Sequence, residues 1–324
     1  MKLARTYSFL KKELDLIEEE LGTVIQADHS VLREASTHLL KAGGKRIRPA
    51  FVLLSGKLGE KYDAEQITII AVSLELIHMA TLVHDDVIDH ADLRRGKPTV
   101  KKQYSNRVAM YTGDYILARA LETITKINNP AVQRCLSHTI VEVCAGEIEQ
   151  MKYKYKWDQN LRVYLRRIKR KTALLIATSC KLGAIAAGLN RKQVLQMYKY
   201  GYYIGMSYQI IDDILDFTSN EKELGKPAGN DLIQGNITLP VLYALQNKSF
   251  QQMIQDLFLT KEEISENQMK EIITKINELG AIDYSYHVSN LYLEKALTVL
   301  NDFPNSDAKK ALVNIALYIG KRRF

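Results

Sequence analysis

Apolar residues recur at helical spacing along most of the chain, and no stretch shows the persuasive alternation of a half-buried strand. Between about 224 and 240, glycine, proline, asparagine and aspartate are dense, which is typical of an ordered loop. The pattern therefore predicts an all-α protein. The expected helices cover about 3–21, 31–42, 64–88, 107–127, 131–156 and 191–217, and more helices cover 241–324 with polar joints near 247–249 and 301–306.

No linker divides the 324 residues, 46% of them are hydrophobic, and only 6 are proline, so a large core of long helices can form. We expect residues 1–324 to be a single domain, a helical bundle around a central cavity. The most apolar windows, 67–83 and 173–189, are interrupted by Glu75 with His78 and by Lys181, so neither indicates a transmembrane helix.

The sequence favours a cytoplasmic protein. The N-terminus has no uninterrupted apolar segment and no small-residue cleavage site that would mark secretion. Cys135, Cys144 and Cys180 form no CxxC pair and lie in apolar helical surroundings, which indicates reduced core cysteines in a reducing compartment.

Two predicted apolar helices carry acids at i, i+1 and i+4. The first cluster is Asp85, Asp86 and Asp89, and the second is Asp212, Asp213 and Asp216. The first and last acid of each cluster lie about 40° apart on one helix face. Carboxylates in apolar surroundings are costly unless a cation meets them, and hard oxygen ligands without a His or Cys cluster favour Mg²⁺ shared with a substrate phosphate. A solvated acidic face could explain one such cluster, but not two in apolar helices.

Several cationic or polar side chains are suited to bind phosphate beside these clusters. The net charge of +8 is compatible with nucleic acid, an anionic membrane surface or a phosphorylated small molecule. No basic fold motif for nucleic acid is seen, so we expect no nucleic-acid partner. The candidates are Lys45 and Arg48 at a predicted helix start, His78 two turns before Asp85, Arg94 and Arg95 in a loop, Lys171 and Thr172 where a basic helix end turns apolar, and Gln209 and Lys226 near the second cluster.

Five motifs in this order resemble the trans-isoprenyl diphosphate synthases. They are GGKRIRP at 43–49, HDDVID with LRRGKPT within 84–99, KTA at 171–173, GMSYQIIDDILD at 205–216 and GKPAGNDLIQGNITLP at 225–240. The resemblance implies an all-α, usually dimeric fold around a deep pocket, and condensation of isopentenyl diphosphate with an allylic diphosphate. Terpene cyclases also use DDxxD, but their second metal motif normally mixes Asn or Asp, Ser or Thr, and Glu.

The resemblance also implies roles for single residues. Mg²⁺ would be bound by Asp85, Asp89, Asp212 and Asp216, which clamp the allylic diphosphate. The same diphosphate would be contacted by Arg94, Lys171, Thr172, Gln209 and Lys226. Isopentenyl diphosphate would be held by Lys45, Arg48, His78 and Arg95, with help from the basic C-terminus.

Product length in the family depends on the residues four and five positions before the first aspartate, where aromatic side chains shorten the product. Here they are Ala80 and Thr81, so the resemblance implies a long-chain product from a primer such as farnesyl diphosphate. A heptaprenyl product for menaquinone is expected, with hexaprenyl and octaprenyl products left open. It also implies either a smaller non-catalytic partner chain or a homodimer, and transient contact with a membrane surface at product release. A non-catalytic subunit of the same fold would show eroded motifs, and none is visible.

Overall fold

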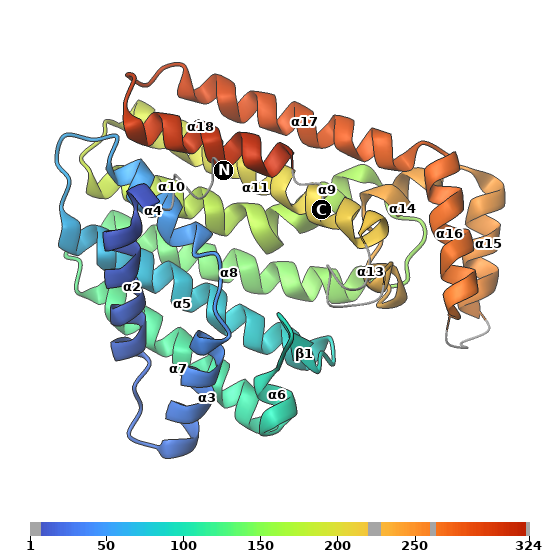
Figure 1. Cartoon of the computed structure of the whole chain (residues 1–324), viewed down its shortest axis with the longest axis horizontal. Coiled ribbons are helices and arrows are strands. Elements are labelled where there is room, and N and C mark those ends of the chain that lie inside the picture. Colours follow the sequence, from blue (N-terminus) through green and yellow to red (C-terminus); the bar gives the residue numbers. More distant parts are fainter. Residues whose placement is uncertain (1–7, 220–227, 260–263, 322–324) are drawn as a thin grey trace. The chain divides into compact units, whose positions relative to one another are not determined.

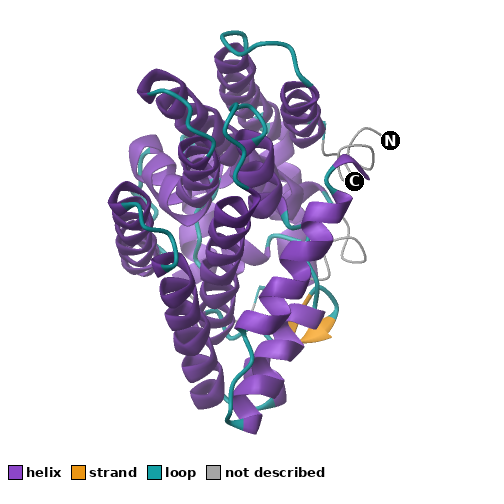
Figure 2. Cartoon of the chain, turned by 90° about the vertical axis from the view of Figure 1, so that its left-hand side faces the viewer, coloured by secondary structure: helices purple, strands orange, loops and turns teal. Residues whose placement is uncertain are grey.

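The computed structural model describes residues 8–219, 228–259 and 264–321, and these residues are predominantly helical (Figures 1 and 2). The all-α prediction is confirmed. The chain forms two compact units: unit 1 is Met1–Val141, Leu175–Gly201 and Val299–Ile315, and unit 2 is Glu142–Leu174, Tyr202–Thr298 and Ala316–Phe324.

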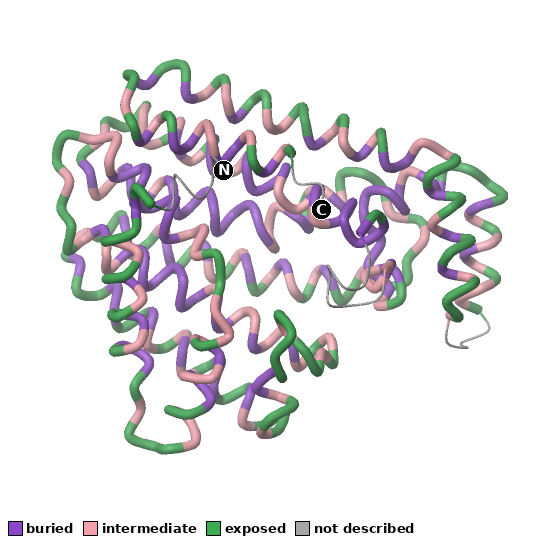
Figure 3. The backbone as a smooth tube through the Cα atoms, in the orientation of Figure 1, coloured by how far each residue is buried: buried purple, intermediate pink, exposed green. Residues whose placement is uncertain are grey.

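Unit 1 is built around α5 (Ala64–Ile88), which packs against α7 (Asn106–Thr125), α4 (Ile47–Gly56) and α2 (Lys11–Val24). The helix begins at Asp63, whose side chain accepts a hydrogen bond from the Gln66 amide. By length and composition α5 could cross a membrane, but 67% of its most apolar window is buried inside the protein, as in a core helix (Figure 3). The unit also contains α3 (Ser30–Lys41), α6 (Val100–Gln103), most of α10 (Leu174–Ala186) and the first half of α8 (Pro130–Tyr153).

A short hairpin follows α5, although the sequence pattern predicted a loop there. Strand β1 (Leu93–Arg94) pairs antiparallel with β2 (Lys97–Pro98). The two residues between them, Arg95 and Gly96, have φ values of 54° and 74°, as in the two-residue turns that match the twist of a hairpin. Strands of two residues are too short to show an alternating pattern, which is why the sequence did not predict them.

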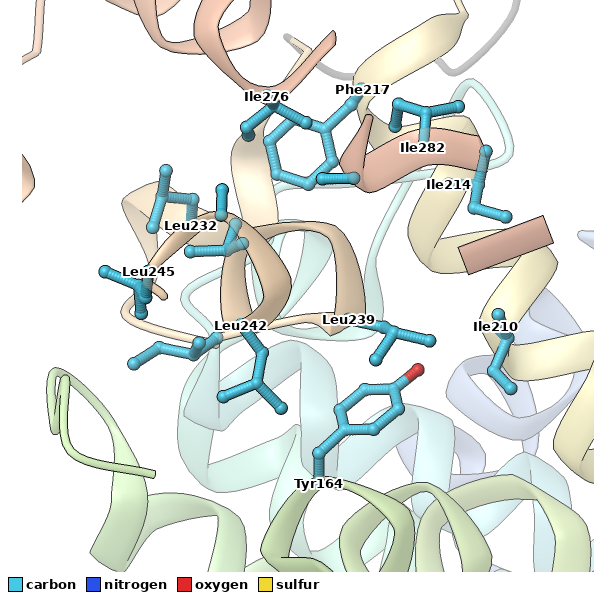
Figure 4. Packing of buried hydrophobic residues seen from close by; sticks show 14 of the residues in the cluster. Tyr164, Ile210, Ile214, Phe217, Leu232, Leu239, Leu242, Leu245, Ile276 and Ile282 are labelled. Atoms are coloured by element: carbon cyan, nitrogen blue, oxygen red, sulfur yellow. The ribbon is translucent and has the colours of Figure 1, made fainter. Parts of the chain in front are cut away.

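Unit 2 packs its core between α11 (Arg191–Thr218), α14 (Leu239–Ala244) and α16 (Glu266–Glu278). Figure 4 shows Ile210 and Ile214 of α11, Leu239 and Leu242 of α14, and Tyr164 of α9 in this cluster. A π-helix, η1 (Lys169–Ala173), connects α9 (Leu161–Ile168) to α10. Of the remaining helices, α13 (Asn230–Ile233), α15 (Lys248–Leu259) and most of α17 (Ala281–Leu300) belong to unit 2, whereas most of α18 (Asp307–Gly320) belongs to unit 1.

Two predicted boundaries were wrong. The helix expected over 131–156 ends at Tyr153, because Tyr155 adopts a left-handed conformation (φ 58°). The expected loop over 224–240 contains the short helix α13, and α14 begins at Leu239.

Candidate functional site

The first acidic cluster lies at the end of α5, in unit 1. Asp85 and Asp89 are half-buried, whereas Asp86 is 3% exposed. Asp86 is held by Arg94 of the hairpin: Nε and Nη2 of the guanidinium donate to Oδ1 at 2.9 and 2.7 Å. Burial raises the pKa of Asp86, and the contact with Arg94 opposes that rise. Asp86 therefore orients Arg94, whose Nη1 is not used in this pair.

The positive charges of four arginines act on His78, which lies two turns before Asp85. Burial, followed by the positive charges of Arg48, Arg95, Arg94 and Arg46, lowers the pKa of His78 well below its usual value. A neutral imidazole carries one N–H donor, so His78 can donate to an anion without adding charge. The arrangement brings together three of the four predicted isopentenyl diphosphate ligands: Arg48, His78 and Arg95. The fourth, Lys45, adjoins Arg46 in sequence.

Arg46 has a structural role that sequence reasoning missed. Its Nε and Nη2 donate to the Glu18 carboxylate at 2.7 and 2.8 Å, and its Nη1 donates to Oε1 of Glu75 at 3.0 Å. Glu75 is 3% exposed, and its Oε2 has no hydrogen-bond partner within the described residues. Arg46 also has a left-handed backbone (φ 44°) at the start of α4. These bonds fix the segment that carries Lys45 and Arg48. The available signal was Glu75 itself, an acid inside an apolar helix.

The second acidic cluster lies on α11, in unit 2, and its middle acid, like Asp86, is buried and hydrogen-bonded to other side chains. Asp213 is 3% exposed and accepts hydrogen bonds from Tyr164 Oη (2.7 Å) and Gln209 Nε2 (2.8 Å). Burial raises the pKa of Asp213 to about 7, and the nearby Asp231 adds to the rise. Asp216 is also buried and accepts from the Asp231 amide at 3.1 Å, while Asp212 is half-buried.

The π-helix η1 positions Lys171 and Thr172. Lys171 Nζ donates to Gln150 Oε1 at 3.1 Å, and the Thr172 hydroxyl donates to Gln209 Oε1. The neighbouring turn of α11 approaches so closely that a Cβ on Gly205 would lie 2.4 Å from Cα of Ala173. π-Helical segments are frequent at functional sites, and this one connects Thr172 to the second acidic cluster through Gln209.

A polar cavity of about 40 Å³ opens within unit 2. Among its lining atoms, Asn236 Oδ1 and Thr238 Oγ1 are buried and lack a hydrogen-bond partner among the described groups. The carboxylate, amide and hydroxyl oxygens that line this cavity are suited to Mg²⁺, and the ammonium group of Lys171 is suited to a phosphate. The lining residues are Gln150, Arg167, Ile168, Lys171, Gln209, Asp213, Asp231, Asn236 and Thr238, of which the sequence had predicted Lys171 and Gln209.

No cluster of three or more His, Cys, Asp or Glu side chains that could hold a metal occurs among the described residues. Mg²⁺ is usually bound by one or two carboxylates, water and substrate phosphates rather than by a complete protein cage. The residues therefore fit a metal that is shared with a diphosphate.

The other predicted positions lie as follows. Ala80 is buried on α5, and Thr81 is half-buried with its hydroxyl donating to the His78 carbonyl at 2.8 Å. Lys226 lies outside the described residues. A separate, largely apolar cavity of about 330 Å³ is lined by the start of α5, including Thr68 and Val72, far along that helix from Asp85.

Comparison with known proteins gives consistent matches. The model of the polyprenyl synthetase family matches residues 29–276. Component 2 of heptaprenyl diphosphate synthase from Bacillus subtilis (strain 168) is 59% identical over 324 residues, which cover 100% of this chain and 92% of that protein.

Two solved structures resemble the chain closely. The crystal structure of heptaprenyl diphosphate synthase from Staphylococcus aureus matches with a TM-score of 0.91 and 44% identity, over 97% of this chain and 98% of that one. A polyprenyl synthase from Caulobacter crescentus CB15, crystallised with calcium and isoprenyl diphosphate, matches with a TM-score of 0.94 and 28% identity, over 99% and 98% of the two chains. The fold is therefore the all-α isoprenoid-synthase fold.

Proposed function

The chain belongs to the polyprenyl synthetase family and is a long-chain polyprenyl diphosphate synthase, and we propose that it extends an allylic diphosphate, farnesyl diphosphate for example, with isopentenyl diphosphate to heptaprenyl diphosphate. The observation that carries this proposal is the presence of two separate polar sites. Unit 1 gathers Arg48, Arg95 and the neutral His78, and unit 2 gathers Lys171, Thr172 and Gln209 beside the second acidic cluster.

The chain's residues have distinct tasks in this reaction. Lys171, Thr172, Gln209, Arg94 and Lys226 bind the allylic diphosphate and stabilise the negative charge that develops when its carbon–oxygen bond breaks. Asp85, Asp89, Asp212 and Asp216 would hold Mg²⁺, which would neutralise the charge of that leaving group.

Isopentenyl diphosphate is held by Lys45, Arg48, His78 and Arg95 so that its double bond attacks the allylic cation. Loss of one proton, which the released diphosphate accepts, completes a five-carbon extension. The family match includes residues of both units, which supports one catalytic domain over 1–324.

A partner chain is part of the proposal, because the Bacillus subtilis relative is named as component 2 of its enzyme. An exposed apolar stripe on α8 supports it: Val141, Cys144, Ile148 and Met151 are spaced alternately by three and four residues, as in a helix that packs along another helix. We infer a smaller non-catalytic subunit as that partner, with a homodimer as the alternative.

We also propose that the enzyme works in the cytoplasm and that its product serves menaquinone side-chain synthesis. The three cysteines form no disulfide in the structure, which supports a reducing compartment. The expectation that all three are core residues was wrong, because only Cys180 is buried, whereas Cys135 is partly exposed and Cys144 is exposed.

The test is incubation with farnesyl diphosphate, labelled isopentenyl diphosphate and Mg²⁺, with and without host-cell extract, followed by measurement of product length. Extract-dependent heptaprenyl diphosphate is expected, and hexaprenyl or octaprenyl product would correct the length alone. Asp85→Ala and Asp212→Ala should each abolish condensation while circular dichroism shows unchanged helix content. Near-full activity in either variant would remove the proposed metal clamp.

A further inference from the structure

An exposed aromatic and aliphatic patch, formed by Tyr155, Trp157, Ile233, Phe258 and Leu259, lies on unit 2. The Phe258 ring is 5.8 Å from the Tyr155 ring and 4.9 Å from the Trp157 ring, and the Tyr155 hydroxyl donates to the Ile233 carbonyl at 3.0 Å. Despite these contacts, Tyr155 is 49% exposed, and Leu259, next to Phe258, is 75% exposed. Clusters of exposed apolar side chains typically mark interaction sites.

Tyr155 is held outward by its backbone. Its φ of 58° is costly for a residue with a side chain, and its amide donates to the Gly235 carbonyl at 3.0 Å. The ring therefore lies against the 233–235 turn rather than in the core. Fixed in this way, it can meet a second surface without losing much conformational entropy.

Lysines precede and follow Tyr155 in the sequence. Lys152 and Lys156 are exposed, and their ammonium groups lie 5.9 and 5.7 Å from the centre of the Tyr153 ring. The segment 152–158 contains three lysines against one aspartate. Aromatic rings with a polar edge and lysines with long apolar stems are the side chains that favour the boundary between water and an anionic bilayer.

We propose that this patch docks the protein on the surface of an anionic lipid bilayer, with Tyr155, Ile233 and Leu259 entering the interfacial region and Lys152 and Lys156 contacting lipid phosphates. The inference rests on the proposed function only in its purpose, which is delivery of a water-insoluble product. The patch adjoins the diphosphate site, because Asp231 and Asn236 line the polar cavity on either side of Ile233. Docking thus involves the segment that borders the polar cavity.

The chain contains one tryptophan, Trp157, so its fluorescence reports on the patch alone. The full-length protein is mixed with vesicles of phosphatidylcholine or of phosphatidylcholine with phosphatidylglycerol, and emission and vesicle flotation are measured. We expect a blue shift and flotation with the anionic vesicles only. Lys152→Glu combined with Lys156→Glu should weaken binding by about tenfold or more, and Leu259→Ser should weaken it similarly.

Matched controls alter other exposed residues: Leu195→Ser, at a leucine that is 53% exposed, and Lys126→Glu combined with Lys192→Glu. They should bind like the wild type. Absence of wild-type binding, or equal binding to both vesicles, overturns the proposal. The proposal is also overturned if Leu259→Ser keeps the wild-type vesicle affinity but forms a smaller oligomer than the wild type by light scattering. That result would make the patch a protein interface.

Condensation is measured in the same preparations with detergent present. The patch variants should keep wild-type rates there. Vesicle binding without condensation would support docking and overturn the proposed function. Condensation without vesicle binding would support the proposed function and overturn docking.

Discussion

Glu75 and Asp86 are buried carboxylates on the same helix, and each holds one arginine of a closely spaced pair. Glu75 bonds Arg46, two residues before Arg48, and Asp86 bonds Arg94, next to Arg95. A buried acid without its cation is costly, so each carboxylate fixes its arginine in place. The other member of each pair is a predicted ligand of isopentenyl diphosphate.

Glu75→Gln should raise KM for isopentenyl diphosphate by about tenfold, because loss of one charged hydrogen bond loosens Arg46 and the segment that carries Lys45 and Arg48. KM for the allylic substrate and the helix content should not change. Steady-state kinetics with each substrate varied in turn measure the difference.

Glu13→Gln is the matched control, since Glu13 bonds Lys57 (2.6 Å) away from that segment. If both KM values rose equally in Glu75→Gln, the positioning role of Glu75 would be wrong. Arg46→Lys, which keeps the charge but cannot form the three-way contact, should reproduce the defect.

At the scale of single residues, the sequence predicted where the acids lie but not which side chains they contact. Helical spacing separated Asp86 from the face shared by Asp85 and Asp89, but it could not show that Asp86 contacts Arg94 or that Asp213 contacts Tyr164. These partners come from the hairpin and from α9. Their approach depends on tertiary packing, which helical periodicity does not encode.

Among the elements, η1 depends on the close approach of α11. Gly205 leaves the space that Ala173 occupies, and Thr172 reaches Gln209 one turn further along α11. The length and bounds of α5 were predicted correctly because its apolar pattern is continuous and Asp63 caps its start. The π-helix was not predicted, because one extra residue in a helical turn leaves no clear signature in the pattern.

Gly205→Ala should destabilise the protein by about 1–3 kcal/mol, because its Cβ would overlap Ala173. It should also lower kcat by displacing Lys171 and Thr172. Thermal or urea unfolding and steady-state kinetics measure the two effects.

Gly22→Ala is the control, since a Cβ there would lie 3.9 Å from Leu40 Cδ2, an ordinary contact. It should stabilise the protein by about 0.5–1 kcal/mol, because alanine favours a helix interior over glycine. Equal stability changes of both variants would contradict the close-packing argument.

At the scale of the whole molecule, the proposed product tunnel and the proposed partner interface set the enzyme's output. The continuous helical pattern predicted the all-α fold, and the five motifs predicted the family. Both can be read from the sequence because neither depends on how the helices pack. The aromatic patch around Phe258 was not predicted, because its members come from three separate segments of the chain.

Ala80→Phe should shorten the main product, because a phenyl ring would enter the proposed product tunnel. Chromatography of the dephosphorylated products measures the shift. Thr68→Phe places the same side chain in the open cavity at the other end of α5 and should leave product length unchanged. An unaltered distribution in Ala80→Phe would mean that Ala80 does not line the tunnel.

Ile148→Lys should weaken assembly with the proposed partner, because it puts a charge in the middle of the α8 stripe, where Ile148 is 68% exposed. Sedimentation velocity, with and without host-cell extract, measures assembly. Leu195→Lys, on α11, is the control and should assemble normally. Normal assembly of Ile148→Lys would place the interface elsewhere.

The two-residue turn at Arg95 and Gly96 leaves the hairpin no freedom in length. Arg94 lies in a strand and grips Asp86, whereas Arg95 lies in the turn and approaches Gly44. Inserting a single residue ahead of them would shift the register of the ladder and carry Arg94 away from Asp86. The buried carboxylate would then lose its cation, so the length of this short hairpin decides whether Asp86 is neutralised.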